Sequence, residues 1–234
     1  MQHRTIFVIA MLILLVPFIY AAPSGPIIYS IRNETITPSS AALVNTSGGS
    51  ITTMVLNATT QNLRWKAYVG NVSGTLTLDD ANSNTIFDWT MANVVGEVYA
   101  TRAATSISWA SINCSTVENI TNEELAINHT SNPDDNISAT FAEQNHASFY
   151  VGNVLIPSDD CFSLHTYQND SAQTTDFEEI LLHDSTNMVY ATILENDELG
   201  YDPNQTFDFQ MIVPERGIPG WSSSTAYYFY VELI

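Results

Sequence analysis

The sequence predicts an all-β protein, built as a single β-sandwich or jelly roll with one short helical insert. Two observations predict this class. The dominant period of the apolar residues is two, which is the pattern of half-buried strands. Clusters of Gly, Asn, Asp and Ser separate these apolar runs at short intervals, as turns between strands do. The 234-residue chain is long enough for one sizeable domain, and neither a repeat nor a low-complexity linker divides it.

The first hairpin is expected early in the domain. In residues 63–69, the apolar Leu63, Trp65, Ala67 and Val69 alternate with longer polar or amphipathic neighbours. Residues 70–74 are rich in Gly and Asn and predict a turn, and residues 75–78 predict the returning strand.

One segment in the middle of the chain predicts a helix. Thr121 to Glu124 has the spacing of a capping box, apolar residues follow it, and Pro133 prevents a longer continuation. The expected element is a helical insert of about two turns between strands.

The second half of the chain predicts several strands. Residues 177–183 and 188–195 form a hairpin across the turn residues 184–187. Residues 207–213 alternate apolar and polar up to Pro214, and the last strand spans residues 225–234 with apolar or aromatic side chains on both faces. Further strands are expected at residues 27–31, 51–56, 97–102, 107–109, 148–156 and 162–167.

The N-terminus predicts secretion. Residues 1–22 combine an early basic residue, an apolar run and small residues at Ala21 and Ala22, which is typical of a cleaved signal peptide. The apolar run is interrupted by Pro17 and is shorter than the roughly 20 residues that span a bilayer. We therefore expect an extracellular or cell-surface protein without a stable membrane span. Its organisation would be an N-terminal strand and linker over 23–40 and a β-sandwich domain over 41–234.

The sequence is rich in acceptor sites for N-linked glycans. Ten of its twenty asparagines stand in the motif Asn-x-Ser/Thr, whereas about four would do so by chance at this Ser and Thr content. They are Asn33, Asn45, Asn57, Asn71, Asn113, Asn119, Asn128, Asn136, Asn169 and Asn204. Because these residue types also favour turns, a turn-rich β protein collects some such motifs without any sugar. Asn57, at the end of a predicted strand, and Asn113, beside a cysteine, are the least accessible candidates.

Charge and cysteine content narrow the partners. The net charge is −19, so a nucleic acid is not an expected partner. The two cysteines, Cys114 and Cys161, would meet an oxidising compartment and are expected to form one disulfide. The alternative is a pair of buried free thiols.

No motif predicts an enzyme. The five histidines show no zinc spacing, and the Gly-x-Ser-x-Gly turn of many serine hydrolases is absent from the sequence. Pairs of carboxylates, as in glycosidases, stay open because they can come from distant strands. Apart from N-linked glycans, calcium is the one candidate ligand. Asp80, Asn82, Asn84 and Asp88 have part of the spacing of a calcium loop, although a turn rich in Asp and Asn explains the same residues.

The N-terminal apolar segment predicts assembly between copies. Ile27, Ile28, Tyr29 and Ile31 lie in an uncharged, β-prone run just after the expected cleavage site. Such a strand can complete the sheet of a neighbouring copy, and repeated addition of this kind grows a fibre. The alternative is that the strand pairs within its own domain.

Two stretches carry a resemblance. Residues 65–80, WKAYVGNVSGTLTLDD, and residues 208–215, DFQMIVPE, resemble secreted archaeal surface proteins of unknown function. The combination of a leader, an apolar segment before a β domain and dense glycan motifs is similar in architecture to pilus-like subunits of glycosylated extracellular filaments joined by donor strands. This similarity implies a homopolymer, with neighbouring copies as partners and with no catalytic residues.

The sequence therefore predicts a structural subunit of an extracellular glycoprotein filament or surface coat, with no enzymatic activity. The alternative is a monomeric carbohydrate-binding or adhesive module, which would use exposed aromatic residues and the Asp80 loop.

Overall fold

The computed structural model describes residues 22–29, 31–36, 40, 43–216 and 224–234. Apart from Ala22, the predicted signal peptide lies outside the described residues. Within the described ranges, no helix is both long and apolar enough to cross a membrane.

The all-β class is confirmed. Two helices, α2 (Val117–Ile127) and α3 (Ile137–Thr140), and one 3-10 turn, η1 (Trp109–Ser111), accompany the strands of the described chain. The strands are β1 (Trp65–Gly70), β2 (Thr75–Asp79), β3 (Thr85–Thr90), β4 (Gly96–Thr101), β5 (Asn113–Cys114), β6 (Phe149–Val151), β7 (Val154–Ile156), β8 (Ser163–His165), β9 (Glu178–His183), β10 (Met188–Ile193), β11 (Glu198–Leu199), β12 (Thr206–Phe207), β13 (Phe209–Pro214) and β14 (Tyr228–Leu233).

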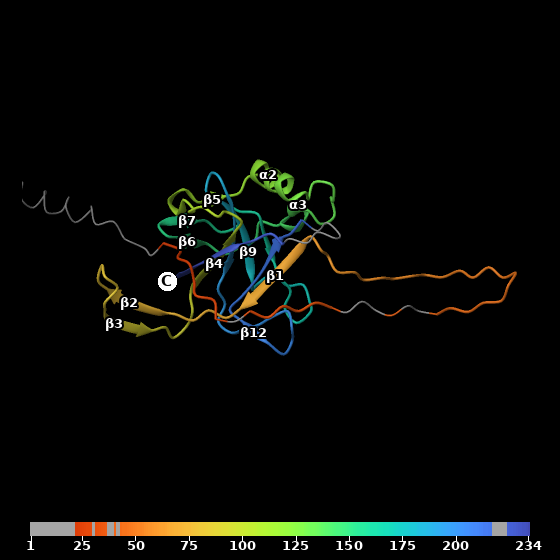
Figure 1. The fold of residues 1–234 in the computed structure, drawn as a ribbon, viewed down its shortest axis with the longest axis horizontal. Coiled ribbons are helices and arrows are strands. Elements are labelled where there is room, and N and C mark those ends of the chain that lie inside the picture. Colours follow the sequence, from red (N-terminus) through yellow and green to blue (C-terminus); the bar gives the residue numbers. More distant parts are fainter. Residues whose placement is uncertain (1–21, 30, 37–39, 41–42, 217–223) are drawn as a thin grey trace, which may run out of the picture.

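A six-stranded antiparallel sheet forms the centre of the molecule (Figure 1). Its order is β14-β4-β10-β9-β5, and β8 also pairs with β9. The remaining strands form two-stranded sheets, in the pairs β1–β13, β2–β3, β6–β7 and β11–β12. Every pairing is antiparallel.

The central sheet is buried on both faces because its alternate residues enter two different apolar clusters. Val98 and Ala100 of β4 pack in one cluster with α2, α3 and β13, whereas Tyr99 packs in the other with β6, β7 and the residues around η1. Two helices and a two-stranded ribbon thus cover the first face. The finer prediction of a sandwich or jelly roll stays a prediction.

The hairpin predicted across residues 183–188 is present, as β9 and β10. Asp184 determines its turn: the N–H of Asp184 donates to the carbonyl of Asn187, and its Oδ1 accepts the N–H groups of Thr186 and Asn187. An Asp at the first position of a turn forms such bonds locally, so this hairpin is readable from sequence.

The hairpin predicted between residues 63–69 and 75–78 is wrong. β1 pairs instead with β13, from Trp65 opposite Pro214 to Gly70 opposite Phe209, and β2 pairs with β3. The chain between them does not close a turn, because the N–H of Val72 donates to the Asp208 carboxylate at 2.6 Å.

The inward face of β1 also differs from the prediction. Tyr68 packs against the core and meets Phe229 edge-on at 4.8 Å, while Leu63 and Val69 stay exposed. Lys66 points inward as well, and its ammonium group donates to the Glu215 carboxylate at 2.9 Å. A partly buried ion pair therefore occupies the face that the alternation of Leu63, Trp65 and Val69 had assigned to solvent.

The helical insert exists but begins earlier than predicted. α2 starts at Val117, and its capping box consists of Thr116 and Asn119 rather than of residues 121–124. Thr121 is a mid-helix residue rather than the N-cap, and its hydroxyl donates to the Val117 carbonyl at 2.8 Å. The short helix α3, capped by Asn136, was not predicted because one turn leaves no apolar period to recognise.

Three predicted strands are not strands in this structure. Residues 107–109 lead into η1, and the described residues of 27–31 and 51–56 form no strand. Residues 148–156 were predicted as one strand but form two, β6 and β7, which pair with each other. The other predicted strands agree with β4, β8, β13 and β14.

The predicted disulfide between Cys114 and Cys161 is present and links residues 47 positions apart. It links β5 to the chain just before β8, and both strands lie along one edge of β9, because β5 places Cys114 opposite Leu182 and β8 places Ser163 opposite Ile180. Neither two-residue β5 nor three-residue β8 covers this edge alone.

Replacing both cysteines by serine is expected to lower the free energy of unfolding by about 2–4 kcal/mol, since the unfolded chain regains the freedom of a long loop. Denaturant unfolding measures this loss, and hydrogen exchange should rise first in β5 and β8. The exposed pair Val117→Ser and Leu125→Ser serves as a control that leaves the disulfide in place. Unchanged exchange at β8 in the double-serine variant would contradict the assigned role of the disulfide.

Candidate assembly site

One edge of the central sheet lies next to the N-terminal segment. β14 is an edge strand, and on its outer side Ser24 and Val231 exchange two backbone hydrogen bonds of 3.0 and 2.8 Å. In this register Pro26 stands opposite Phe229. Because proline has no N–H, the pairing cannot continue in that direction. The bridge at Ser24 is therefore isolated, and the chain leaves the edge after it.

The predicted donor residues follow this bridge and remain uncovered. Ile27, Ile28, Tyr29 and Ile31 have exposed fractions of 76%, 60%, 89% and 79%. Four large apolar side chains at such exposure within a few residues form an unusual surface, because monomeric proteins rarely expose large apolar patches. The alternative in which this segment pairs within its own domain is not what the isolated chain adopts over the described residues of 27–31.

A long arm, described at residues 31–36, 40 and 43–64, continues from this segment to β1. The chain runs away from the domain and returns to β1 with its tip at one end of the molecule (Figure 1). The tip turns at residues 47–50, where the N–H of Ser50 donates to the Ser47 carbonyl. No Asp, Glu, Lys or Arg occurs between Glu34 and Arg64, although the whole chain carries a net charge of −19.

A third exposed element is the β2–β3 hairpin, which is amphipathic. Its register places Leu76 opposite Trp89 and Leu78 opposite Phe87, so these four side chains lie on one face. Their exposed fractions lie between 43% and 58%. Thr and Asp residues occupy the other face, since Thr75, Thr77, Asp88 and Thr90 form the alternate pairs.

The candidate calcium loop is the turn of this same hairpin. Asp80 Oδ1 accepts the N–H groups of Asn82 and Asn84 at 2.8 Å each, and its Oδ2 accepts Nδ2 of Asn84 at 2.8 Å. The hydrogen bond from the Asn84 side chain and those from the two backbone groups lower the pKa of Asp80. Asp88 lies on β3 opposite Thr77, away from this turn. Over the described ranges, no group of three or more His, Cys, Asp or Glu side chains is arranged to hold a metal ion, and calcium remains a prediction.

A buried pair of carboxyl groups holds β14 to the sheet. Glu232 of β14 stands directly opposite Glu97 of β4, and both are buried. The Tyr99 hydroxyl lies between them, 3.1 Å from Glu232 Oε2 and 3.4 Å from Glu97 Oε2, and the Gly152 N–H donates to both oxygens of Glu232 at 3.0 Å. These donors satisfy one carboxylate. The other carboxyl group has to keep its proton, because two adjacent buried negative charges repel.

The electrostatics agree with this assignment. Burial, and secondly the charge of Glu232, raise the pKa of Glu97 to about 8. Burial also raises the pKa of Glu232. Sequence reasoning missed this pair because nothing local distinguishes Glu97 and Glu232 among 25 acidic residues.

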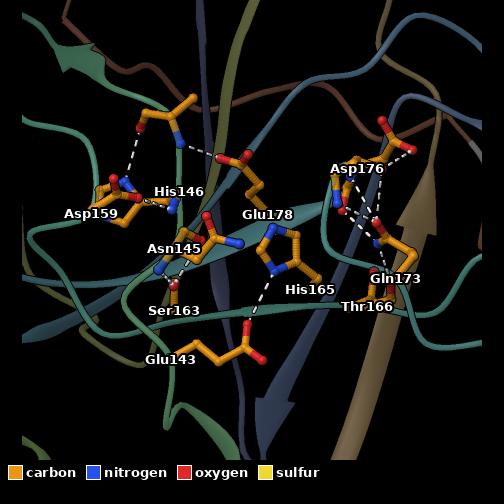
Figure 2. A network of polar contacts seen from close by, with 12 residues as sticks. Glu143, Asn145, His146, Asp159, Ser163, His165, Thr166, Gln173, Asp176 and Glu178 are labelled. Carbon is orange, nitrogen blue, oxygen red and sulfur yellow. Dashed lines mark hydrogen bonds and ion pairs between the residues drawn. The ribbon is translucent and has the colours of Figure 1, made fainter.

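A second polar group surrounds β8 and attaches two loops to the sheet edge (Figure 2). The Ser163 hydroxyl donates to the Asn145 carbonyl at 3.0 Å and accepts the Asn145 N–H at 2.9 Å. The Glu178 carboxylate accepts the Ala147 N–H at 2.6 Å. These bonds are directed at backbone groups and hold the chain that precedes β6.

The two histidines of this group also serve the local fold. His146 Nε2 accepts the Cys161 N–H at 3.0 Å, and its Nδ1 lies 2.9 Å from the Ala147 carbonyl, so a neutral ring with the proton on Nδ1 satisfies both contacts. His165 Nδ1 lies 3.3 Å from Glu143 Oε2. The network thus positions the chain beside the disulfide.

The ten predicted glycan acceptors are placed mainly at the surface. Eight are exposed, among them Asn57 and Asn113, which sequence reasoning had considered the least accessible. Asn119 and Asn136 are half-buried, and both accept hydrogen bonds in helix caps. Asn119 is the more constrained of the two: its Oδ1 accepts the Thr116 N–H at 2.9 Å and its Nδ2 lies 3.4 Å from His183 Nε2.

Comparison with known proteins identifies no relative: no protein-family model, no curated protein and no solved structure matches this chain.

The Glu97–Glu232 pair predicts a specific pH dependence of stability. The folded-state pKa of Glu97, about 8, lies above the ordinary value of 4.5, so the folded chain holds a proton that the unfolded chain releases. Stability is therefore highest below the unfolded pKa and falls as pH rises toward the folded pKa. Glu97→Gln removes this loss and should raise the Tm at pH 8 by several degrees over wild type, with a small difference at pH 5, because 1 kcal/mol corresponds to about 2–4 °C in a domain of this size.

The matched control is Glu118→Gln, which changes the same charge on the exposed first turn of α2. Glu179 is also buried with a raised pKa, so it lowers the stability of every variant as pH rises. The result is therefore read from the difference in Tm between each variant and wild type. Parallel Tm profiles of wild type and Glu97→Gln between pH 5 and 8 would contradict the assigned protonation.

Glycopeptide mass spectrometry of the native protein tests the acceptor sites. Occupancy is expected at the exposed asparagines, and Asn119 is expected to be the least occupied because a sugar there displaces Nδ2 from His183. Asn136 is the internal comparison, since it also caps a helix but uses only its Oδ1 to do so. Full occupancy at Asn119 together with empty exposed sites would contradict this prediction.

Proposed function

We propose that the protein is a structural subunit of an extracellular glycoprotein filament or surface coat, in which copies join by strand addition. The observation that carries the proposal is the segment at 27–31, which is apolar, uncharged and exposed next to an open sheet edge. A strand that leaves its own domain can pair its backbone groups with a neighbour's edge and bury its apolar side chains there.

β14 is the acceptor edge that fits this role. Its outer side pairs with the described chain only at Ser24, so most of its outward backbone groups remain open to an added strand. An unpaired edge of this kind is normally protected in secreted proteins. No glycan acceptor motif falls within β14 or after it.

The negative net charge of the protein favours contacts between copies through uncharged segments. Two copies that each carry a net charge of −19 repel one another unless they meet through uncharged parts. The donor segment contains no charged residue. The predicted leader, the disulfide and the dense acceptor motifs all favour an extracellular location for such an assembly.

A carbohydrate-binding module is the second candidate function, favoured by one observation. Phe87 and Trp89 contact each other edge-on at 5.0 Å on the exposed face of the β2–β3 hairpin, and the Asp80 loop lies at the end of the same hairpin. Exposed aromatic rings beside polar groups are a surface on which a sugar ring can stack. This module would remain monomeric and be retarded on glycan affinity media.

Deleting residues 27–31 tests the main proposal. The deleted protein is expected to stay monomeric under conditions in which the full chain forms polymers, because no donor strand remains. Electron microscopy and light scattering measure the polymer, and near-UV circular dichroism checks that the domain is folded.

The matched control is Val117→Ser with Leu125→Ser, which removes two exposed apolar side chains of α2 and should leave polymers unchanged. Polymers of normal length from the deleted protein would disprove donation by this segment. A full chain that stays monomeric and binds glycans would favour the second function.

A further inference from the structure

The β2–β3 hairpin exposes a face that requires a partner. A two-stranded hairpin is at best marginally stable in water, and a third strand or a packed layer is normally needed. Here the four apolar side chains Leu76, Leu78, Phe87 and Trp89 lie on one face and remain exposed. Both outer edges of the hairpin are also free of any further strand within the described chain.

The arm contains a segment with the complementary properties. Residues 51–56 have the apolar, β-prone composition of a strand, but the isolated chain leaves them without one. Ile51 and Val55 are exposed at 99% and 97%, close to the maximum for any side chain. This segment lies in the uncharged stretch between Glu34 and Arg64.

The two elements cannot meet within one copy in this arrangement. The β2–β3 hairpin lies toward one end of the long axis of the molecule, and the tip of the arm lies at the other (Figure 1). A contact between them therefore joins the hairpin end of one copy to the arm end of the next copy. Such a contact is heterologous and continues from copy to copy.

We propose that the apolar face and free edge of the β2–β3 hairpin receive residues 51–56 of a second copy as a third strand. This inference rests on the proposed function and names a second contact within the same assembly. The added strand completes a three-stranded sheet, which is the smallest sheet with independent stability. Its alternate apolar side chains pack beside those of the outer hairpin strand and extend the apolar face of Leu76, Leu78, Phe87 and Trp89. Residues 51–56 thereby gain the strand partner that they lack in the single chain.

Charge and glycan placement favour this occupant over other surfaces of the same copy. The arm contributes no charged residue to the contact, so it adds no repulsion against Asp79, Asp80 and Asp88 of the hairpin. The nearest acceptor motifs, Asn45 and Asn57, flank residues 51–56, and none falls inside them or inside the hairpin. Sugars at these sites would border the contact without interrupting it.

Photo-crosslinking tests the contact directly. The full chain with p-benzoylphenylalanine in place of Phe87 is mixed with an isotope-labelled copy, polymerised and irradiated, and the crosslinked peptides are identified by mass spectrometry. Crosslinks to residues 51–56 of the other copy are expected. Crosslinks to residues 27–31, to another surface or to a glycan, and polymers without any crosslink, would each overturn the inference.

A matched pair of variants gives an independent readout. Leu76→Asp with Leu78→Asp places two charges on the apolar face, and Thr75→Asp with Thr77→Asp places the same two charges on the opposite face of the same strand. The first pair is expected to reduce the polymer fraction at least tenfold, and the second to leave it near that of wild type. Equal effects of the two pairs would overturn the inference.

These results separate the two proposals. Normal polymers from the Leu76/Leu78 variant, together with no polymers from the chain that lacks residues 27–31, would refute the hairpin contact and leave the proposed function standing. A wild-type chain that forms no polymer at any concentration would refute both.

Discussion

The burial of β4 between β10 and β14 is the constraint on which the rest of the structure depends. Every residue of this strand is buried, and its alternate side chains enter the two apolar clusters on opposite faces of the sheet. Gly96 begins the strand with a φ of 141°, where a Cβ would overlap the carbonyl of Glu232. The close approach of β14 to β4 thus depends on a residue without a side chain. Both covering layers, and the edge presented by β14, follow from this central pairing.

Buried and partly buried polar groups hold the two edges of the central sheet in place. The Glu97–Glu232 pair sits between β4 and the edge strand, and the Glu215 carboxylate, whose pKa is lowered to about 2, accepts hydrogen bonds from Lys66 and from Thr225 just before β14. The network at β8 secures the opposite edge together with the disulfide. The central sheet is therefore anchored at both edges, while the N-terminal arm and the β2–β3 hairpin have few contacts with it. This division between a well-packed domain and uncovered apolar elements is the physical basis for proposing assembly.

The acidic surface and the uncharged arm belong to one arrangement. A net charge of −19 keeps copies apart over most of their surface. The uncharged arm and the apolar face of the β2–β3 hairpin lie toward opposite ends of the molecule (Figure 1). The outer edge of β9 is covered by β5 and β8, whereas the described chain pairs with the outer edge of β14 only at Ser24.

Local chemistry by itself determined the strand class, the β9–β10 hairpin and the disulfide. The first follows from a period of two, the second from the Asp184 turn, and the third from two cysteines in a sequence for which secretion is predicted. The sequence also predicted an apolar donor segment at 27–31 and a polar turn at Asp80. The structure leaves Ile27, Ile28, Tyr29 and Ile31 exposed, and Asp80 accepts the hydrogen bonds of such a turn.

Only the tertiary structure decided the partner of β1, the inward position of Lys66 and the pairing of Glu97 with Glu232. Each depends on residues more than a hundred positions apart, whose proximity no local period records. The apolar face of the β2–β3 hairpin was predictable only in part. The alternations Leu76-x-Leu78 and Phe87-x-Trp89 are visible in the sequence, but that nothing in the described chain covers them emerges only in three dimensions. Periodicity shows which side chains share a face, whereas burial depends on what else in the chain reaches that face.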